Sequence, residues 1–141
     1  MPSKKRSAAK PRKPVVYFLD RCVGVEPLYS ALKALGLAVE IHDDHFPRDA
    51  EDRDWLAVVG SKGWIVLTKD KKIQYRPLEQ EALRVSGARA FVLVADGLRG
   101  ADICDLFVKS IPGMERILRG RRGPFIARIT SSGRVLIWKE W

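Results

Sequence analysis

Residues 64–70 read WIVLTKD, a short apolar run that ends on an aspartate, and this pattern recurs along the chain. VVYFLD ends at Asp20, AFVLVAD ends at Asp96, and LAVEIHD ends more weakly at Asp43. Continuous runs rich in Val, Ile and Phe predict strands buried on both faces of a parallel sheet. Parallel strands end at a common edge, where open α/β sheets bind ligands. The sequence therefore predicts a cluster of carboxylates at the carboxyl edge of one sheet.

Helical patterns separate these runs, as expected for repeated βαβ units. We expect strands at 15–20, 37–42, 64–68 and 91–95. Helices are expected from 26–28 to Gly36 and from 49–52 to Gly60, with a third starting at Pro77. The region 101–118 is also helical in pattern, and Pro112-Gly113 predicts its division into two helices. FIARIT and RVLIW, on either side of residues 131–133, predict a C-terminal hairpin.

Composition indicates one globular domain. The chain has 141 residues, of which 46% are hydrophobic, enough for one core without structural metal. No run approaches the ~20 apolar residues of a membrane span, and no secretion signal is present, so we expect a soluble, cytoplasmic protein. Cys22 and Cys104 lack the spacing of a zinc knuckle or disulfide framework. We predict a domain over 15–141 after a basic, unfolded tail at 1–14.

Positive charge is concentrated at two places. The net charge is +9, and residues 1–14 hold six cations and no acid. A second basic region comprises Arg116, Arg119, Arg121 and Arg122. Such density suits RNA phosphates or an acidic partner, and a solvated surface that keeps the protein soluble is the alternative.

A single aspartate after a strand is ordinary, because it caps turns. Several converging aspartates are not, because two charges ~4 Å apart repel by ~4 kcal/mol at an effective dielectric of ~20. A divalent cation would remove that cost. The cations Arg21, Lys69 and Lys71 adjoin Asp20 and Asp70, as phosphate chemistry would require, although simple neutralisation would also explain them.

Other kinds of site have less support. His42 and His45 could bind a transition metal together with Asp43 or Asp44. Two histidines without cysteines or a third histidine are weak evidence for such a site. The chain has no G-x-x-x-x-G-K-[ST], G-x-G-x-x-G or G-x-S-x-G, which argues against P-loop nucleotidases, dinucleotide enzymes and α/β-hydrolases.

Three segments together resemble the PIN-like domains grouped with VapC-type toxins. They are FLDRCVG with Asp20, EDRDWL with Asp52, and GWIVLTKD with Asp70, and the resemblance spans about residues 15–95. It implies a three-layer α/β/α sandwich with a mainly parallel sheet, to which the chain adds the C-terminal hairpin. It also implies an endoribonuclease that depends on Mg²⁺ or Mn²⁺ and is neutralised by a cognate antitoxin protein.

The resemblance assigns roles by position. Asp20 and Asp70 become metal ligands and Asp52 the third acid, with Glu51 or Asp54 as substitutes if the helix register differs. Asp96 is the candidate fourth ligand from its place after a strand, and Asp43 becomes a turn residue. The expected RNA contacts are Arg21, Lys69, Lys71, Arg119, Arg121 and Arg122.

Two other functions stay open. One is a non-catalytic RNA- or protein-binding module with the same fold. The other is a phospho-acceptor domain of receiver type, which would need an acidic pair at Asp20 and a lysine after FIARIT, and the chain has neither. A homodimer stays open as well.

Overall fold

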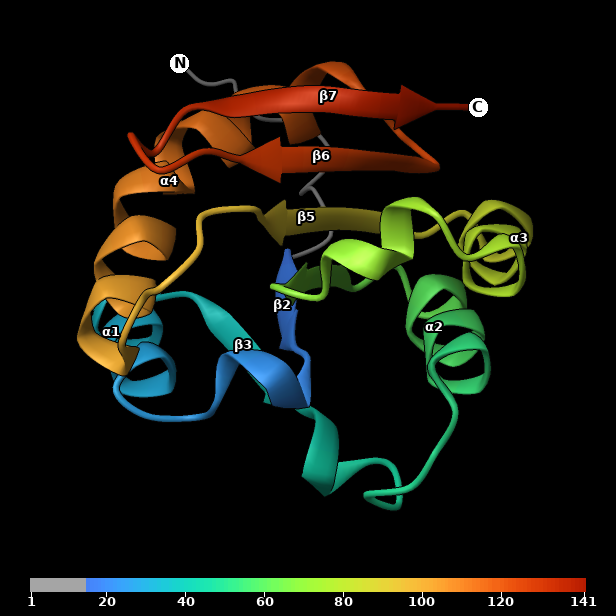
Figure 1. Ribbon diagram of the computed structural model, residues 1–141, viewed down its shortest axis with the longest axis horizontal. Coiled ribbons are helices and arrows are strands. Elements are labelled where there is room, and N and C mark those ends of the chain that lie inside the picture. The colour runs from blue at the N-terminus through green and yellow to red at the C-terminus, as the bar shows by residue number, and fades with distance from the viewer. Residues whose placement is uncertain (1–14) are drawn as a thin grey trace, which may run out of the picture.

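The computed structural model describes residues 15–141, so the expected basic tail at 1–14 lies outside the described residues. One sheet of six strands forms the centre of this part of the chain (Figure 1). The strands are β2 (Val16–Leu19), β3 (Ala38–Ile41), β4 (Ile65–Thr68), β5 (Arg89–Leu93), β6 (Phe125–Ile129) and β7 (Val135–Glu140). The helices are α1 (Leu28–Ala34), α2 (Asp52–Ser61), α3 (Pro77–Ser86) and α4 (Gly100–Gly120), with 3-10 turns η1 (Arg21–Val23), η2 (His42–Asp44) and η3 (Lys71–Gln74).

The order of the strands is β3-β2-β4-β5-β6-β7, and all neighbours are parallel except β6 and β7. From β2 the chain first adds β3 on one side and then returns to place β4 on the other. The strand order therefore reverses between β2 and β4. In open α/β sheets the crevice at such a switch point, beyond the carboxyl ends of the strands, is the usual ligand site.

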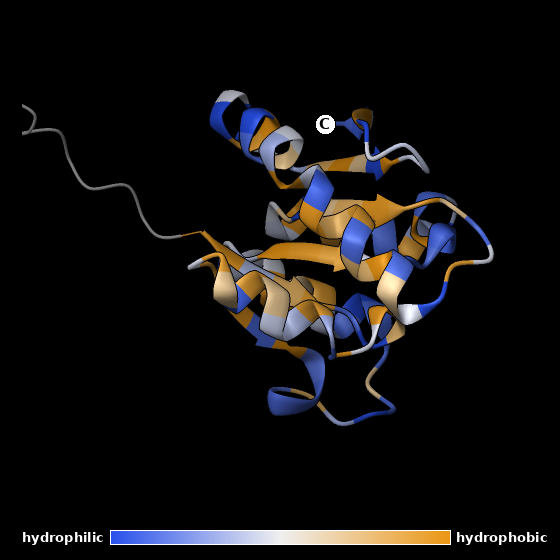
Figure 2. Ribbon diagram, turned by 90° about the vertical axis from the view of Figure 1, so that its left-hand side faces the viewer, coloured by the Kyte–Doolittle hydropathy of each residue, from blue (hydrophilic) through white to orange (hydrophobic). Residues whose placement is uncertain are grey.

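Alternate residues of each central strand enter two separate cores. On β2, Tyr17 and Leu19 pack beneath α1 and α4, whereas Phe18 packs beneath α2 and α3. Figure 1 shows the two helix pairs on opposite sides of the sheet, and Figure 2 shows the hydrophobic residues concentrated on the strands and the helix sides toward them. Burial of each large apolar side chain contributes roughly 1.5–3 kcal/mol. The predicted three-layer α/β/α sandwich is confirmed.

The prediction that Pro112 divides the last helical region was wrong, because α4 is continuous from Gly100 to Gly120. Pro112 is exposed, whereas Phe107, Ile111 and Met114 are buried against the sheet. A proline inside a helix removes one backbone hydrogen bond. Here the apolar stripe is in register on both sides of the proline, so packing holds the two halves in one helix.

The C-terminal hairpin is present as predicted. β6 and β7 pair antiparallel, and Gly133 in the connecting turn has a φ of 84°, which favours glycine. β7 is the edge strand, and its residues are partly buried or exposed. None of the helices within residues 15–141 is long and apolar enough to cross a membrane.

Candidate functional site

Thr68, the last residue of β4, connects two of the predicted acids across the switch point. Its hydroxyl donates to Oδ2 of Asp20 at 2.8 Å and accepts the backbone N–H of Asp70 at 3.0 Å. Asp20 follows β2, and its own N–H bonds to the Leu67 carbonyl at 3.0 Å. Asp70 caps η3 by accepting the Lys72 N–H at 3.0 Å. The threonine of T-x-D thus fixes the relative positions of Asp20 and Asp70.

Asp52 reaches the same place from α2, of which it is the first residue. Oδ1 of Asp52 accepts a hydrogen bond from the Trp55 indole at 2.9 Å, and Trp55 is 2% exposed. An acid in the first turn is also stabilised by the helix dipole. The buried indole orients the carboxylate and leaves its second oxygen, Oδ2, facing Arg76.

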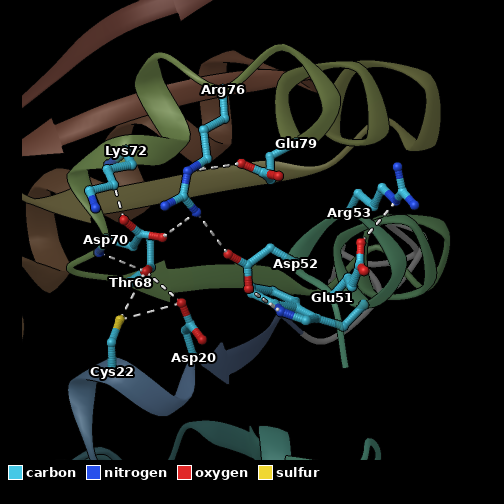
Figure 3. A network of polar contacts seen from close by, with 11 residues as sticks. Asp20, Cys22, Glu51, Asp52, Arg53, Thr68, Asp70, Lys72, Arg76 and Glu79 are labelled. Carbon is cyan, nitrogen blue, oxygen red and sulfur yellow. Dashed lines mark hydrogen bonds and ion pairs between the residues drawn. The ribbon is translucent and has the colours of Figure 1, made fainter. Parts of the chain in front are cut away.

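A fourth acid, Glu79, comes from the first turn of α3. Arg76, the residue before that helix, lies between Glu79, Asp52 and Asp70 (Figure 3). Its Nη1 is 3.5 Å from Asp52 Oδ2 and 3.7 Å from Asp70 Oδ2, and its Nε is 3.6 Å from Glu79 Oε1. These separations are those of ion pairs, longer than good hydrogen bonds.

Two adjoining cavities show what surrounds the acids. The inner one, of about 10 Å³, is lined by Asp20, Asp52, Asp70 and Glu79 together with Trp55, Leu56, Thr68 and Ile73. The outer one, of about 410 Å³, opens beside Asp20, Asp52 and Asp70, and its walls include Arg21, Cys22, His42, Arg48 and Lys69. The acids therefore line the floor of a pocket whose walls carry several cations.

The pKa values show the cost of gathering the acids. Burial raises the pKa of Asp20, the hydrogen bonds from Thr68 and Cys22 lower it, and the nearby charge of Asp52 raises it. Burial also raises the pKa of Glu79, with Arg76 opposing and the charges of Asp52 and Asp70 adding to the rise. A cation placed among these acids would favour their charged forms.

The thiol of Cys22 is an additional polar group at Asp20. Its Sγ lies 3.3 Å from Asp20 Oδ2 and 3.2 Å from Thr68 Oγ1. Burial, followed by the charge of Asp20, raises the pKa of Cys22 to about 11. The thiol therefore stays protonated at neutral pH and donates to the carboxylate.

The donor chemistry of the inner cavity fits a hard divalent ion. Carboxylate oxygens are the ligands that Mg²⁺ and Mn²⁺ prefer, and Oε1 of Glu79 is buried without a hydrogen-bond partner. Within residues 15–141, no three acidic, histidine or cysteine side chains stand at the spacing of a formed metal site. In this arrangement Arg76 supplies the positive charge among the acids.

Residues 15–95 match the family model of a PIN like domain. The chain belongs to the PIN-like domain family. No curated protein and no solved structure matches the chain significantly. The PIN-like domain is a nuclease-type fold, and the matched residues include Asp20, Asp52, Asp70, Glu79 and Arg76.

The PIN-like domain does not bring Asp96 to the other acids. β5 begins at Arg89 and ends at Leu93, two residues earlier than predicted, because Arg89 and Ala90 pair with both neighbouring strands. Asp96 therefore lies beyond the strand end, where it is 88% exposed and paired with Lys71. These two residues line a separate cavity of about 200 Å³. Glu79 takes the place among the acids that we expected for Asp96.

The predicted RNA contacts divide between two edges of the sheet. Arg21 and Lys69 line the outer cavity of the acids, and Arg48, which we had not singled out, lies with them. Arg119 lines a different groove beside the start of β2 and β4, and Arg121 pairs with Glu140 at the end of β7. α4 begins near the carboxyl edge and returns to the amino edge. The arginines at its C-terminal end and the exposed Arg122 therefore lie at the edge of the sheet opposite to the acids.

The histidines do not form a transition-metal site among the described residues. His45 bonds Glu40 through Nε2 at 2.7 Å. His42 is buried against Phe18, Phe46 and Trp55. Asp43 lies in η2 and pairs with Arg21 at 3.1 Å.

Proposed function

We propose that the protein is a metal-dependent ribonuclease that hydrolyses RNA phosphodiester bonds, with Mg²⁺ or Mn²⁺ held by Asp20, Asp52, Asp70 and Glu79. The observation that supports this most is the Thr68 hydroxyl, which ties Asp20 to Asp70 at the switch point of the sheet. Such hydrogen bonds to prospective ligands orient them and are a regular part of metal sites. The nuclease-type fold of the PIN-like family supports the same reaction class.

The walls of the outer cavity suit an RNA backbone. Arg21 is oriented by Asp43 at 3.1 Å and by the Arg48 carbonyl at 3.3 Å, so its guanidinium is held at the mouth. Arg48 and Lys69 line the same opening. Guanidinium and ammonium groups bind phosphate oxygens through charge-assisted hydrogen bonds. We assign to these three residues the positioning of the scissile phosphate above the acids.

The bound metal would supply an acidified water and neutralise charge on the phosphate and the leaving oxygen. The protein's own residues supply the geometry. Trp55 and Thr68 hold Asp52 and Asp20 by hydrogen bonds, and the Lys72 N–H holds Asp70. Because these donors are backbone or buried groups, the carboxylates need little reorganisation when they take up a cation.

The direct test is cleavage of a labelled single-stranded RNA in Mg²⁺, Mn²⁺ or EDTA. We expect cleavage only with metal, and a loss of at least about 100-fold in Asp70→Asn, since removal of one group that stabilises transition-state charge costs that much. Asp105→Asn, an exposed acid on α4, is the matched control and should cleave normally. Equal cleavage by Asp70→Asn and wild type, or cleavage in EDTA, would reject the assignment.

The same assay decides between the two candidates for the fourth acid. Glu79→Gln should lower cleavage and Mn²⁺ affinity, whereas Asp96→Asn should not, because Asp96 lies in a separate cavity beside Lys71. The reverse result would restore Asp96 and remove Glu79 from the site.

We propose further that this ribonuclease is the toxin of a type II toxin–antitoxin pair and binds a cognate antitoxin protein. The resemblance of the three acidic segments to VapC-type toxins supports this. Expression of the wild type should arrest growth, Asp70→Asn should not, and the product of a small adjoining gene should bind the protein and restore growth. If cells that express soluble, active enzyme grow normally, the toxin role is rejected and the ribonuclease activity is not. A homodimer belongs to the same proposal and is tested by the mass in solution.

A non-catalytic RNA- or protein-binding module is the second candidate. The observation in its favour is Arg76, which already balances charge among Asp52, Asp70 and Glu79. Calorimetric titration with Mn²⁺ separates the two functions, because the module would bind no Mn²⁺ and would keep its RNA affinity in Asp70→Asn.

A further inference from the structure

Arg76 is the one basic side chain whose ion pairs reach three of the four acids in the described part of the chain. Figure 3 shows its guanidinium between Asp70 on one side and Asp52 and Glu79 on the other. The oxygens that it faces are Oδ2 of Asp52 and Oδ2 of Asp70. The second oxygen of each is already engaged, with the Trp55 indole and the Lys72 N–H respectively. Arg76 thus faces the oxygens that Asp52 and Asp70 have left for a metal.

The backbone of Arg76 is fixed, whereas its side chain can move. Its N–H bonds the Lys72 carbonyl at 3.0 Å, its carbonyl accepts the Gln80 N–H at 3.0 Å, and Pro77 starts α3 directly after it. The side chain is 43% exposed and its three ion pairs are all 3.5 Å or longer.

The charges make Arg76 and a metal alternatives. Four acids line the inner cavity, and the Arg76 guanidinium pairs with three of them, so it lowers their mutual repulsion. A divalent ion at Asp52 and Asp70 would be repelled by a guanidinium against the same oxygens. The guanidinium and the divalent ion therefore cannot contact these oxygens at the same time.

We propose that Arg76 is a resident cation that competes with the divalent metal for Asp52 and Asp70, so that metal binds only as the guanidinium withdraws into solvent. The inference rests on the proposed metal site and adds a residue that sets its affinity. In the metal-free protein, Arg76 lowers the repulsion among the carboxylates. Because metal binding displaces the guanidinium, the same interaction lowers the affinity for metal.

The test is calorimetric titration of metal-free protein with MnCl₂, which needs no catalytic activity. We expect Arg76→Gln to bind Mn²⁺ about tenfold more tightly than wild type, because one nearby positive charge is removed. Arg84→Gln is the matched control. It removes the same charge from within α3, the helix that Arg76 precedes. Arg84 pairs there with Glu81, away from the acids, and its loss should leave Mn²⁺ affinity unchanged.

A second measurement covers the metal-free state. In EDTA, Arg76→Gln should melt at a lower temperature than Arg84→Gln, and saturating Mn²⁺ should narrow that difference. Arg76→Lys keeps the charge and should bind Mn²⁺ with nearly wild-type affinity, which keeps the inference testable if the glutamine variant fails to fold.

Equal or weaker Mn²⁺ binding by a folded Arg76→Gln would overturn the competition and leave the metal site standing. Absence of Mn²⁺ binding in both wild type and Arg76→Gln would overturn the competition together with the proposed function.

Discussion

Residues 15–95 and residues 96–141 complete one sheet, yet they contribute different things to the protein. The first region carries the four acids and Arg76, and it is the region that matches the PIN-like family. The second region supplies α4, β6 and β7, whose Phe107, Met114, Phe125 and Ile126 are fully or almost fully buried. The charged residues of the candidate site lie in the first region, whereas the second region adds apolar core residues and the strands at one edge of the sheet.

Because the acids and the C-terminal apolar residues lie in different regions, the site and the stability of the core can be changed separately. The acids lie beyond strand ends, where their charges cost folding energy, as the raised pKa values of Asp20 and Glu79 show. The C-terminal region balances such costs through buried area. Substitutions in each region should therefore give opposite patterns of stability and metal binding.

The largest effect on folding should come from the C-terminal region. Phe107 on α4 is fully buried in the core beneath α1 and α4, so Phe107→Ala should lower the free energy of unfolding by about 3–5 kcal/mol. The Mn²⁺ affinity of the protein that remains folded should not change. Urea unfolding and Mn²⁺ titration at low temperature measure the two quantities, with the exposed Arg116→Ala as control. A stable Phe107→Ala that no longer binds Mn²⁺ would contradict the separation of the regions.

Thr68 should show the opposite pattern. Thr68→Val removes the hydroxyl that joins Asp20 to Asp70, and loss of such a supporting group typically costs about 10- to 100-fold in metal affinity or activity. Stability should change by only about 1–2 kcal/mol.

Thr130, which follows β6 at the same edge of the sheet, is the control from the other region. Its hydroxyl contacts Ser132 at 3.0 Å and accepts the Arg134 N–H, away from the acids. Thr130→Val should leave RNA cleavage unchanged. Equal losses in the two variants would mean that the whole edge, not the bridge between the acids, governs the site.

A smaller effect is expected at Trp55. Trp55→Phe keeps most of the buried area but removes the hydrogen bond to Asp52 Oδ1, which should cost about 1 kcal/mol of stability and about tenfold in Mn²⁺ affinity. Trp64 packs partly buried against the same core and serves as the comparison residue. If Trp64→Phe weakened Mn²⁺ binding as much, packing and not the indole donor would orient Asp52.

The sequence predicted the sandwich and three of the clustered acids for identifiable reasons. Asp20 and Asp70 follow buried strands, and the parallel order forces the ends of those strands to one edge. Asp52 was predicted from its place at a helix start within the family-like segment. Each of these inferences depends on local pattern and on topology, which the chain specifies within short segments.

Glu79 and Arg76 were missed because their place depends on how α2 and α3 pack side by side. An acid after Pro77 signals only a helix start, and Arg76 shows no pattern of its own. Asp96 lies apart from the other acids because β5 ends at Leu93, before the end of its apolar run. Pro112 was misjudged because tertiary packing overrides the local cost of a proline in α4.

The smallest effect should be a pH dependence confined to the acid site. Burial raises the pKa of Asp20 above its ordinary 3.8, so the folded protein holds this proton more tightly than the unfolded chain does. Between the unfolded pKa and the higher folded pKa, the folded state binds more protons, and the free energy of unfolding falls as pH rises. Below that pH window the stabilising contribution of protonated Asp20 is present in full, and above the window this contribution has been lost.

Asp20→Asn cannot lose a proton, so in EDTA it should melt a few degrees higher than wild type at pH 7. It should lose this advantage as the pH falls through that window, with none left below about 4. Thermal melts of both proteins from pH 3.5 to 7.5 isolate the contribution of Asp20 ionisation to stability, because the other acids titrate in both proteins and cancel in the difference. Asp105→Asn, an exposed acid from the C-terminal region, should follow the wild-type curve throughout. A pH-independent difference between Asp20→Asn and wild type would show that the acid cluster imposes no charge cost on folding. In that case the contrast between a costly site and a stabilising C-terminal core would not hold.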